Sequence, residues 1–160
     1  MSLETALAHL ESFGRADQVL ITPGSSATVA EAAAAFGVGP ERIAKTLSFA
    51  LDEDSCALVV MAGDARTDNA AFKAQFGRKA SMLKGESVER LTGHAVGGVC
   101  PFANPESATV WLDTSLRRFD TVFPAAGSAN SAIELTCEEL EELSGASGWV
   151  TVSRLPENDS

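Results

Sequence analysis

A glycine-rich segment with one cysteine, GHAVGGVCPFANP at residues 93–105, is the first candidate for chemistry in this sequence. In it, Gly97 and Gly98 precede Cys100 and Pro101. Glycine lets a ligand approach main-chain N–H groups closely, and a nearby proline restricts the loop. Such amides can stabilise the oxyanion formed during acyl transfer, although the same residues are also typical of an ordinary turn.

Cys100 offers a second chemistry, because a thiolate is a nucleophile. A catalytic thiol needs a lowered pKa and a base within hydrogen-bond reach. His94 lies six residues earlier and His9 falls in an amphipathic segment, but the sequence identifies no residue that would orient either imidazole. We therefore expect Cys100 to be a small loop residue, with a cysteine-dependent hydrolase as an alternative.

Three further polar residues stand at the ends of predicted strands or in loops. Lys45 begins a predicted strand, where its ammonium can bind a phosphate or carboxylate or simply extend into water at a sheet edge. Asn130, in the loop AAGSANSA, can donate and accept hydrogen bonds, although such asparagines are commonly structural. Asp113 ends the segment WLD, and we expect it to cap the following turn.

Helices and strands must together position these residues. Periodicity predicts helices over residues 3–13, 30–37, 67–77, 86–93 and 137–145. Capping boxes are expected for Thr28 with Glu31 and for Thr136 with Glu139, and either Thr67 or Asp68 should cap the third helix. Strands are predicted over residues 18–22, 45–51, 56–63, 80–84, 108–113, 121–127, 131–136 and 148–153. The strands at 45–51 and 56–63 should form an antiparallel hairpin with a loop of about four residues. This order predicts one α+β domain with a mixed or mainly antiparallel sheet.

Length and composition narrow the class of protein. The chain has 160 residues, of which 45% are hydrophobic, which suits one domain with a substantial core. It has neither an apolar run of about twenty residues nor a basic signal-peptide start, so we expect a cytoplasmic protein that does not contact a membrane. Three cysteines without close spacing and two histidines favour neither a disulfide framework nor a zinc site, and we expect no cofactor.

The charge is strongly negative but unevenly distributed. A formal net charge of −10 argues against a general nucleic-acid binder such as a DNA-binding protein. The interval 66–90 is nevertheless basic, because it contains Arg66, Lys73, Arg78, Lys79, Lys84 and Arg90. This stretch is either a solvated helix and loop or a local basic surface.

Four segments in this order, AKTLSF, GHAVGGVCPFA, WLD and FPAAGSANSAIEL, resemble the YbaK/EbsC family of aminoacyl-tRNA deacylases. These proteins are freestanding relatives of the editing domain inserted in bacterial prolyl-tRNA synthetases. The resemblance implies a single compact domain with a curved mixed, mainly antiparallel sheet surrounded by helices. It also implies a cleft that hydrolyses the ester between a wrong amino acid and tRNA. We expect residues 1–153 to form this domain and residues 154–160 to form a flexible tail.

The resemblance also assigns roles to individual residues. Lys45 would anchor the terminal nucleotide, and Thr46 matches its polar neighbour in the family motif. Gly97 and Gly98 match the main chain that faces the ester, so the catalytic set is these two glycines and Lys45. The remaining residues expected to bind the substrate are Val99, Cys100, Pro101 and Asn130.

At three positions the comparison with the family is informative about specificity. Cys100 falls where relatives carry a serine or threonine, so a thiol is not required there. Ala125 and Ala132 replace a serine and an aspartate of the cysteine-specific branch. The general deacylase chemistry therefore fits this sequence, whereas no particular amino acid is indicated.

Together these assignments predict a trans-editing hydrolase for tRNA mischarged with a small amino acid. No protein nucleophile is required, and Arg78, Lys79 and Lys84 would contact the acceptor stem. The expected partners are the acceptor end of aminoacyl-tRNA and an aminoacyl-tRNA synthetase. The alternative is a non-catalytic module of the same fold that binds aminoacyl-tRNA or a synthetase.

Overall fold

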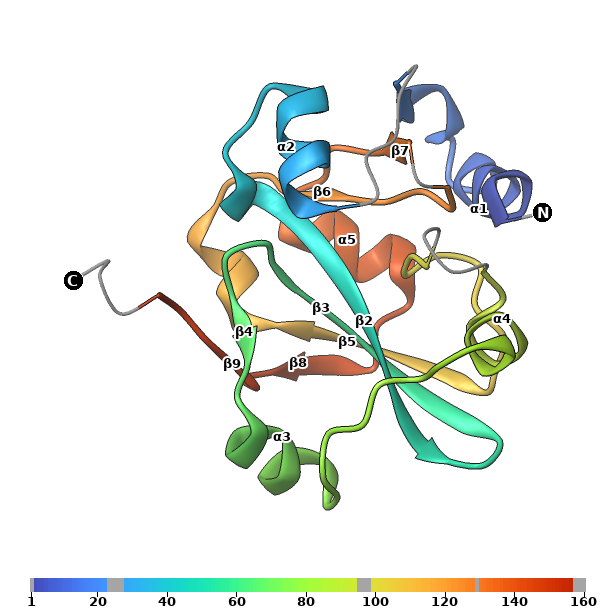
Figure 1. Ribbon diagram of the computed structural model, residues 1–160. Helices are drawn as coiled ribbons and strands as arrows, with labels where there is room; N and C mark the ends of the chain where they lie inside the picture. Colours follow the sequence, from blue (N-terminus) through green and yellow to red (C-terminus); the bar gives the residue numbers. More distant parts are fainter. Residues whose placement is uncertain (1, 23–27, 95–98, 129, 157–160) are drawn as a thin grey trace.

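A long antiparallel hairpin forms the centre of the molecule (Figure 1). In the computed structural model, which describes residues 2–22, 28–94, 99–128 and 130–156, the hairpin joins β2 (Ile43–Asp52) to β3 (Ser55–Ala62). The predicted hairpin is confirmed, but its turn is tighter than expected because Asp52 already pairs with Ser55. The apolar run of β3 is buried almost throughout, as expected for a strand covered on both faces.

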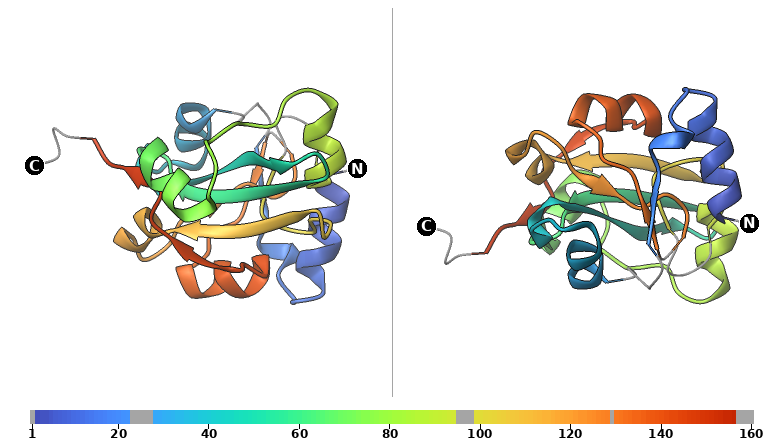
Figure 2. Two further views of the ribbon diagram at one scale, coloured as in Figure 1. Left: turned by 90° about the horizontal axis from the view of Figure 1, so that it is seen from below. Right: turned by 90° about the horizontal axis from the view of Figure 1, so that it is seen from above.

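The hairpin lies within a curved five-stranded sheet of order β6-β2-β3-β5-β8 (Figure 2). Its other members are β5 (Ala108–Asp113), β6 (Phe123–Pro124) and β8 (Gly148–Val150). The mixed sheet is confirmed, with one correction to its strand directions: within the described residues, antiparallel pairing in this sheet is confined to the hairpin. β2–β6, β3–β5 and β5–β8 are parallel, because the chain crosses over through helices between β3 and β5 and between β5 and β8.

Two short antiparallel pairs lie outside the central sheet. β1 (Leu20–Ile21) pairs with β7 (Ser131–Ala132), and β4 (Arg66–Thr67) pairs with β9 (Ser153–Arg154). The strand predicted at 80–84 is reduced to one bridge between Met82 and Phe49, with a backbone hydrogen bond to β2 on each side of it. β9 continues the pairing to Arg154, one residue into the predicted tail.

Three of the helices in the described residues begin at capping residues that the sequence predicts. The helices are α1 (Ser2–Glu11), α2 (Val29–Phe36), α3 (Asn69–Phe76), α4 (Glu86–Thr92) and α5 (Cys137–Ser144), with 3-10 helices η1 (Ala16–Gln18), η2 (Pro40–Arg42) and η3 (Thr114–Arg118). Thr28 with Glu31, and Thr136 with Glu139, form the two expected capping boxes. Asp68 caps α3 by accepting a hydrogen bond from the Ala71 amide.

Helices cover both faces of the sheet, with α3 and α5 on opposite sides (Figure 1). Phe72 of α3 packs on Phe49 of β2 with ring centroids 4.6 Å apart, and Phe76 meets Trp111 of β5 edge to face. Leu140 and Leu143 are the buried face of α5. In the part of the chain that the structure describes, no helix has the length and apolar character needed to cross a membrane.

Candidate functional site

The outer edge of β2 is paired at both ends and open in the middle. At one end Ile43 and Ala44 pair with β6. At the other end the Ala50 amide donates to the Ser81 carbonyl at 2.8 Å, and the Ser48 carbonyl accepts from the Leu83 amide at 3.0 Å. No described strand pairs with this edge between those two regions.

The opening leaves main-chain groups of Thr46 available to a ligand. Backbone groups of alternate residues in a strand point to the same edge, so the N–H and C=O of Thr46 face outward like those of Ser48 and Ala50. The Thr46 side chain adds to this, because its Oγ1 is buried and has no hydrogen-bond partner among the described residues. A buried hydroxyl without a partner costs about 1–3 kcal/mol, which a polar ligand group at this position would recover.

A cavity of about 400 Å³ opens at this gap. Its walls come from β2, α2, the segment before α4, the start of α4 and the segments around β6 and β7. They include the apolar side chains of Phe36, Met82, Val88 and Phe123. This volume is typical of sites for small molecules. Among the described residues that line the cavity, Lys45 is the only titratable one.

The Lys45 ammonium is held at one end of the cavity by main-chain carbonyls. Its Nζ donates to the Gly63 carbonyl at 3.3 Å and to the Ala65 carbonyl at 2.5 Å. An ammonium carries three protons, so one is left for a ligand. Burial lowers the pKa of Lys45; the negative charge of Asp64 opposes this shift, and the positive charge of Arg66 adds to it.

The turn that supplies these carbonyls is tightly packed, and glycine is required there. A Cβ on Gly63 would lie 2.0 Å from the carbonyl oxygen of Pro40 and 2.8 Å from Cγ1 of Val29. Cβ atoms do not approach other atoms that closely, so any larger residue would displace the backbone. The position of the Lys45 ammonium therefore depends on close packing of this turn against η2 and α2.

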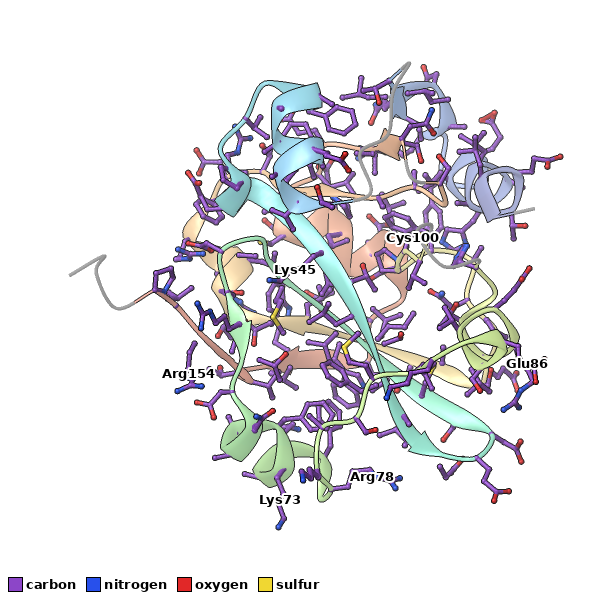
Figure 3. All side chains as sticks on the ribbon, viewed as in Figure 1. Lys45, Lys73, Arg78, Glu86, Cys100 and Arg154 are labelled. Atoms are coloured by element: carbon purple, nitrogen blue, oxygen red, sulfur yellow. The ribbon has the colours of Figure 1, made fainter. Side chains whose placement is uncertain are left out.

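The glycine-rich segment reaches the cavity through Val99, which is one of its lining residues. Gly97 and Gly98 lie outside the described residues. Cys100 and Pro101, both expected to contact the substrate, are buried and do not line the cavity. Figure 3 shows Cys100 well apart from Lys45.

The structure brings His94 next to Cys100, but not in an arrangement that activates the thiol. The His94 Nε2 lies 3.4 Å from the Cys100 sulfur and 2.7 Å from the carbonyl oxygen of Phe102. Since a carbonyl can only accept, Nε2 carries a proton and cannot act as the base. Burial raises the pKa of Cys100 to about 12 and lowers the pKa of His94, so both groups are neutral near pH 7.

Asn130, which we expect to contact the substrate, makes two hydrogen bonds within the protein. Its Nδ2 donates to the Thr22 carbonyl and its Oδ1 accepts from the Ser128 hydroxyl, both at 2.8 Å. These bonds tie Asn130 to Ser128 and to Thr22, which follows β1, and Asn130 does not line the cavity. Ser128 and Ser131 do line it, and they were missed as site residues although the serines of AAGSANSA are the relevant signal.

Two alanines singled out from the sequence are cavity residues. Ala125 and Ala132 form a bridge to each other and both line the cavity, with Ala132 only 3% exposed. The wall is therefore apolar where the cysteine-specific relatives would place a serine and an aspartate. No cluster of acidic, histidine or cysteine side chains suited to a metal ion is found within the described ranges.

Asp113 is confirmed as a cap. Its Oδ2 accepts from the Ser115 amide at 2.9 Å and from the Ser153 hydroxyl at 2.6 Å. Its Oδ1 accepts from the Val152 amide at 2.8 Å, so this fully buried carboxylate joins η3 to the strand that follows β8.

The basic residues Arg78, Lys79 and Lys84 are exposed on the segment that joins α3 to α4. This segment passes the cavity, because Met82 and Leu83 line it and Lys84 follows directly. Arg78 lies at the α3 end of the segment (Figure 3). Lys84 therefore lies near the rim of the cavity, and Lys79 and Arg78 lie further from it along the segment that joins α3 to α4.

Comparisons with known proteins show which proteins this chain is similar to. Residues 24–143 match the family model described as the aminoacyl-tRNA editing domain. The uncharacterized protein YwhH of Bacillus subtilis (strain 168) is 48% identical over 154 residues, which cover 96% of this chain and 98% of that protein.

Solved structures extend the likeness to the whole fold. One is the crystal structure of "a putative trans-editing enzyme for prolyl tRNA synthetase", with a TM-score of 0.84 and 29% identity, covering 96% of this chain and 97% of that one. Another is the hypothetical protein APE2540, with a TM-score of 0.78 and 32% identity, covering 91% of this chain and 99% of that one.

Proposed function

Because this chain belongs to the aminoacyl-tRNA editing domain family, we propose that it hydrolyses the ester of tRNA mischarged with a small amino acid. The observation that carries this proposal is the cavity at the open edge of β2. It combines an anchored ammonium, free main-chain groups and an apolar wall, and its described residues include no side-chain nucleophile activated by a base.

Lys45 binds the nucleotide end of the substrate. The third proton of its ammonium contacts a phosphate or ribose oxygen of the terminal nucleotide, while the Gly63 and Ala65 carbonyls fix the other two. Thr46 contributes its unpartnered hydroxyl and outward main chain to the aminoacyl group. This places the ester between Lys45 and the apolar wall.

Hydrolysis proceeds by positioning and electrostatics. Main-chain amides from Gly97 to Val99 polarise the ester carbonyl, and a hydroxyl of the terminal ribose positions water. The water oxygen adds to the carbonyl carbon, the bond to the ribose oxygen breaks, and that oxygen takes up a proton. One oxyanion donor is worth about 3 kcal/mol, and an ester is already an activated acyl group, so the required acceleration is modest.

Selectivity follows from the size of the cavity. Ala125 and Ala132 leave room for a small side chain, whereas the rings of Phe36 and Phe123 limit its length. Steric exclusion rejects larger groups sharply and smaller ones weakly, so the enzyme accepts several small amino acids. Proline and bulky residues are excluded.

Arg78, Lys79 and Lys84 bind the acceptor stem on the outside of the cavity. Contacts of this kind are weak and salt-sensitive, which suits turnover. Aminoacyl-tRNA as substrate places the protein in the cytoplasm, alone or bound to an aminoacyl-tRNA synthetase.

A binding module that holds aminoacyl-tRNA or a synthetase without hydrolysis is the second candidate. Ala125 and Ala132 favour it, because both line the cavity at positions where the resemblance implies a serine and an aspartate in the cysteine-specific branch. Purified protein should be tested against tRNA charged with alanine, serine, threonine or cysteine. Turnover of at least one supports the hydrolase, whereas binding of all without turnover supports the module.

A further inference from the structure

Two arginines oppose each other directly on the β4–β9 pair. The register of this antiparallel pair places Arg66 across from Arg154. Side chains at opposed positions lie on the same face, with Cβ atoms about 4.5–5.5 Å apart, and like charges there are destabilising. Both residues are exposed, and Figure 3 shows Arg154 at the surface beside β9.

No carboxylate of the described residues neutralises this pair. Within the described ranges, the arginines that form ion pairs are Arg15, Arg42, Arg90 and Arg118. Two acids lie equally near Arg66 in sequence. Asp64 is bound by both Nη atoms of Arg118, at 3.2 and 2.5 Å, and Asp68 caps α3 by accepting a hydrogen bond from the Ala71 amide at 3.1 Å. In a chain with a net charge of −10, two opposed and unpaired guanidinium groups indicate a site for an anion.

The arginine pair is continuous with the cavity. Arg66 directly follows Ala65, whose carbonyl accepts the hydrogen bond from Lys45 Nζ. The charge of Arg66 also contributes to lowering the pKa of Lys45, which indicates that the two cations are close. Lys45, Arg66 and Arg154 therefore form a row of positive charge that starts at the end of the cavity and runs outward along β4 and β9.

We propose that Arg66 and Arg154 bind successive phosphates of the single-stranded 3′ end of tRNA as it leaves the cavity. This proposal rests on the proposed function, since the terminal nucleotide is taken to lie at Lys45. Guanidinium groups bind phosphate oxygens through paired N–H donors, and neighbouring phosphates relieve the repulsion between the two arginines. The tRNA would then contact two basic surfaces of the protein. The arginine pair would bind near its 3′ end, and residues 78–84 would bind near its acceptor stem.

The test compares the Arg66→Ala/Arg154→Ala double variant with Lys73→Ala/Arg90→Ala, which removes the same charge from α3 and α4. The probe is a fluorescent single-stranded RNA ending in the tRNA 3′ sequence. The arginine variant should bind it about tenfold more weakly at low salt. Loss of two phosphate contacts should also reduce the slope of log K against log salt by about 1.4. The control variant loses the same net charge but no proposed phosphate contact. Its affinity should therefore fall only slightly, and its slope should stay close to that of the wild type.

A second measurement separates this proposal from the proposed function. Hydrolysis of a short 3′-aminoacyl adenosine, which reaches Lys45 but not the arginines, should be unchanged in the arginine variant, while hydrolysis of charged tRNA should fall. If wild-type protein hydrolyses neither substrate, the proposed function fails. The RNA-binding comparison still tests whether Arg66 and Arg154 bind phosphates. Equal RNA binding by the arginine and control variants, or equal loss on both substrates, would overturn the proposal.

Discussion

The Nε2 atom of His94 lies 3.4 Å from the Cys100 sulfur but donates its proton to the Phe102 carbonyl at 2.7 Å. Histidine and cysteine are therefore neighbours without forming a base–nucleophile pair. The thiol is fully buried and its pKa is raised to about 12, so almost no thiolate exists near pH 7. The candidate site is therefore the cavity that Val99 lines, and the His94–Cys100 pair is not part of it.

The first prediction concerns alkylation of the native protein. Iodoacetamide reacts with thiolates, so buried Cys100, and Cys56 with its pKa raised to about 11, should resist it. The half-buried Cys137 should react first. Mass spectrometry of the labelled protein should find modification at Cys137 with deacylation unchanged. Loss of activity in step with labelling of Cys100 would contradict this assignment.

The second prediction concerns pH. Burial lowers the pKa of Lys45 below its ordinary value of 10.5, so the ammonium loses its charge at a lower pH than an exposed lysine would. Affinity for adenosine 5′-monophosphate, measured by NMR titration, should therefore fall with rising pH in a window that begins below 10.5. Lys45→Arg should abolish this fall, because a guanidinium stays charged. A wild-type affinity that is constant up to that pH would show that Lys45 does not bind the phosphate.

The third prediction concerns selectivity. Ala132→Val adds two methyl groups to the cavity wall, so threonyl-tRNA should lose about tenfold more deacylation than alanyl-tRNA. Ala132→Ser, which is nearly isosteric, should leave this ratio almost unchanged. Rates for both substrates with both variants provide the measurement. If the valine variant slows the two substrates equally, the amino acid does not lie against Ala132.

The fourth prediction concerns the turn that holds Lys45. Gly63→Ala should destabilise the protein by about 1–3 kcal/mol, because its Cβ would meet the Pro40 carbonyl at 2.0 Å. It should also reduce deacylation by displacing the carbonyls that bind the ammonium. Gly148→Ala is the matched control, since its Cβ would lie 3.5 Å from the Trp111 ring, an ordinary contact. Thermal melts and rates that do not distinguish the two variants would count against the packing described for Gly63.

Local signals in the sequence were sufficient to predict the helices. The capping boxes at Thr28 and Thr136 and the Asp68 cap involve residues within three positions of each other, so the sequence contains the whole interaction. The β2–β3 hairpin is local in the same sense. The parallel pairing of β3 with β5 was not predicted, because strand direction across a helical crossover depends on tertiary packing.

The site could be predicted only in part for the same reason. The sequence indicated Lys45, and Val99 within the glycine-rich segment, and both line the cavity. It did not indicate that the Asn130 side chain donates a hydrogen bond to the Thr22 carbonyl, because these residues are 108 positions apart in the sequence. Nor did it show which of Val99 and Cys100 faces the cavity, since this depends on the direction of the chain after the glycines.

The most direct test of the account compares two variants on one substrate, the charged tRNA that wild-type protein hydrolyses fastest. Under single-turnover conditions, Lys45→Ala should lower the deacylation rate at least tenfold, about 1.4 kcal/mol in barrier, because it removes the charge that anchors the nucleotide. Cys100→Ser should retain the rate to within about twofold, because the thiol supplies no nucleophile. An inactive Cys100→Ser variant beside an active Lys45→Ala variant would contradict hydrolysis at the open edge of β2.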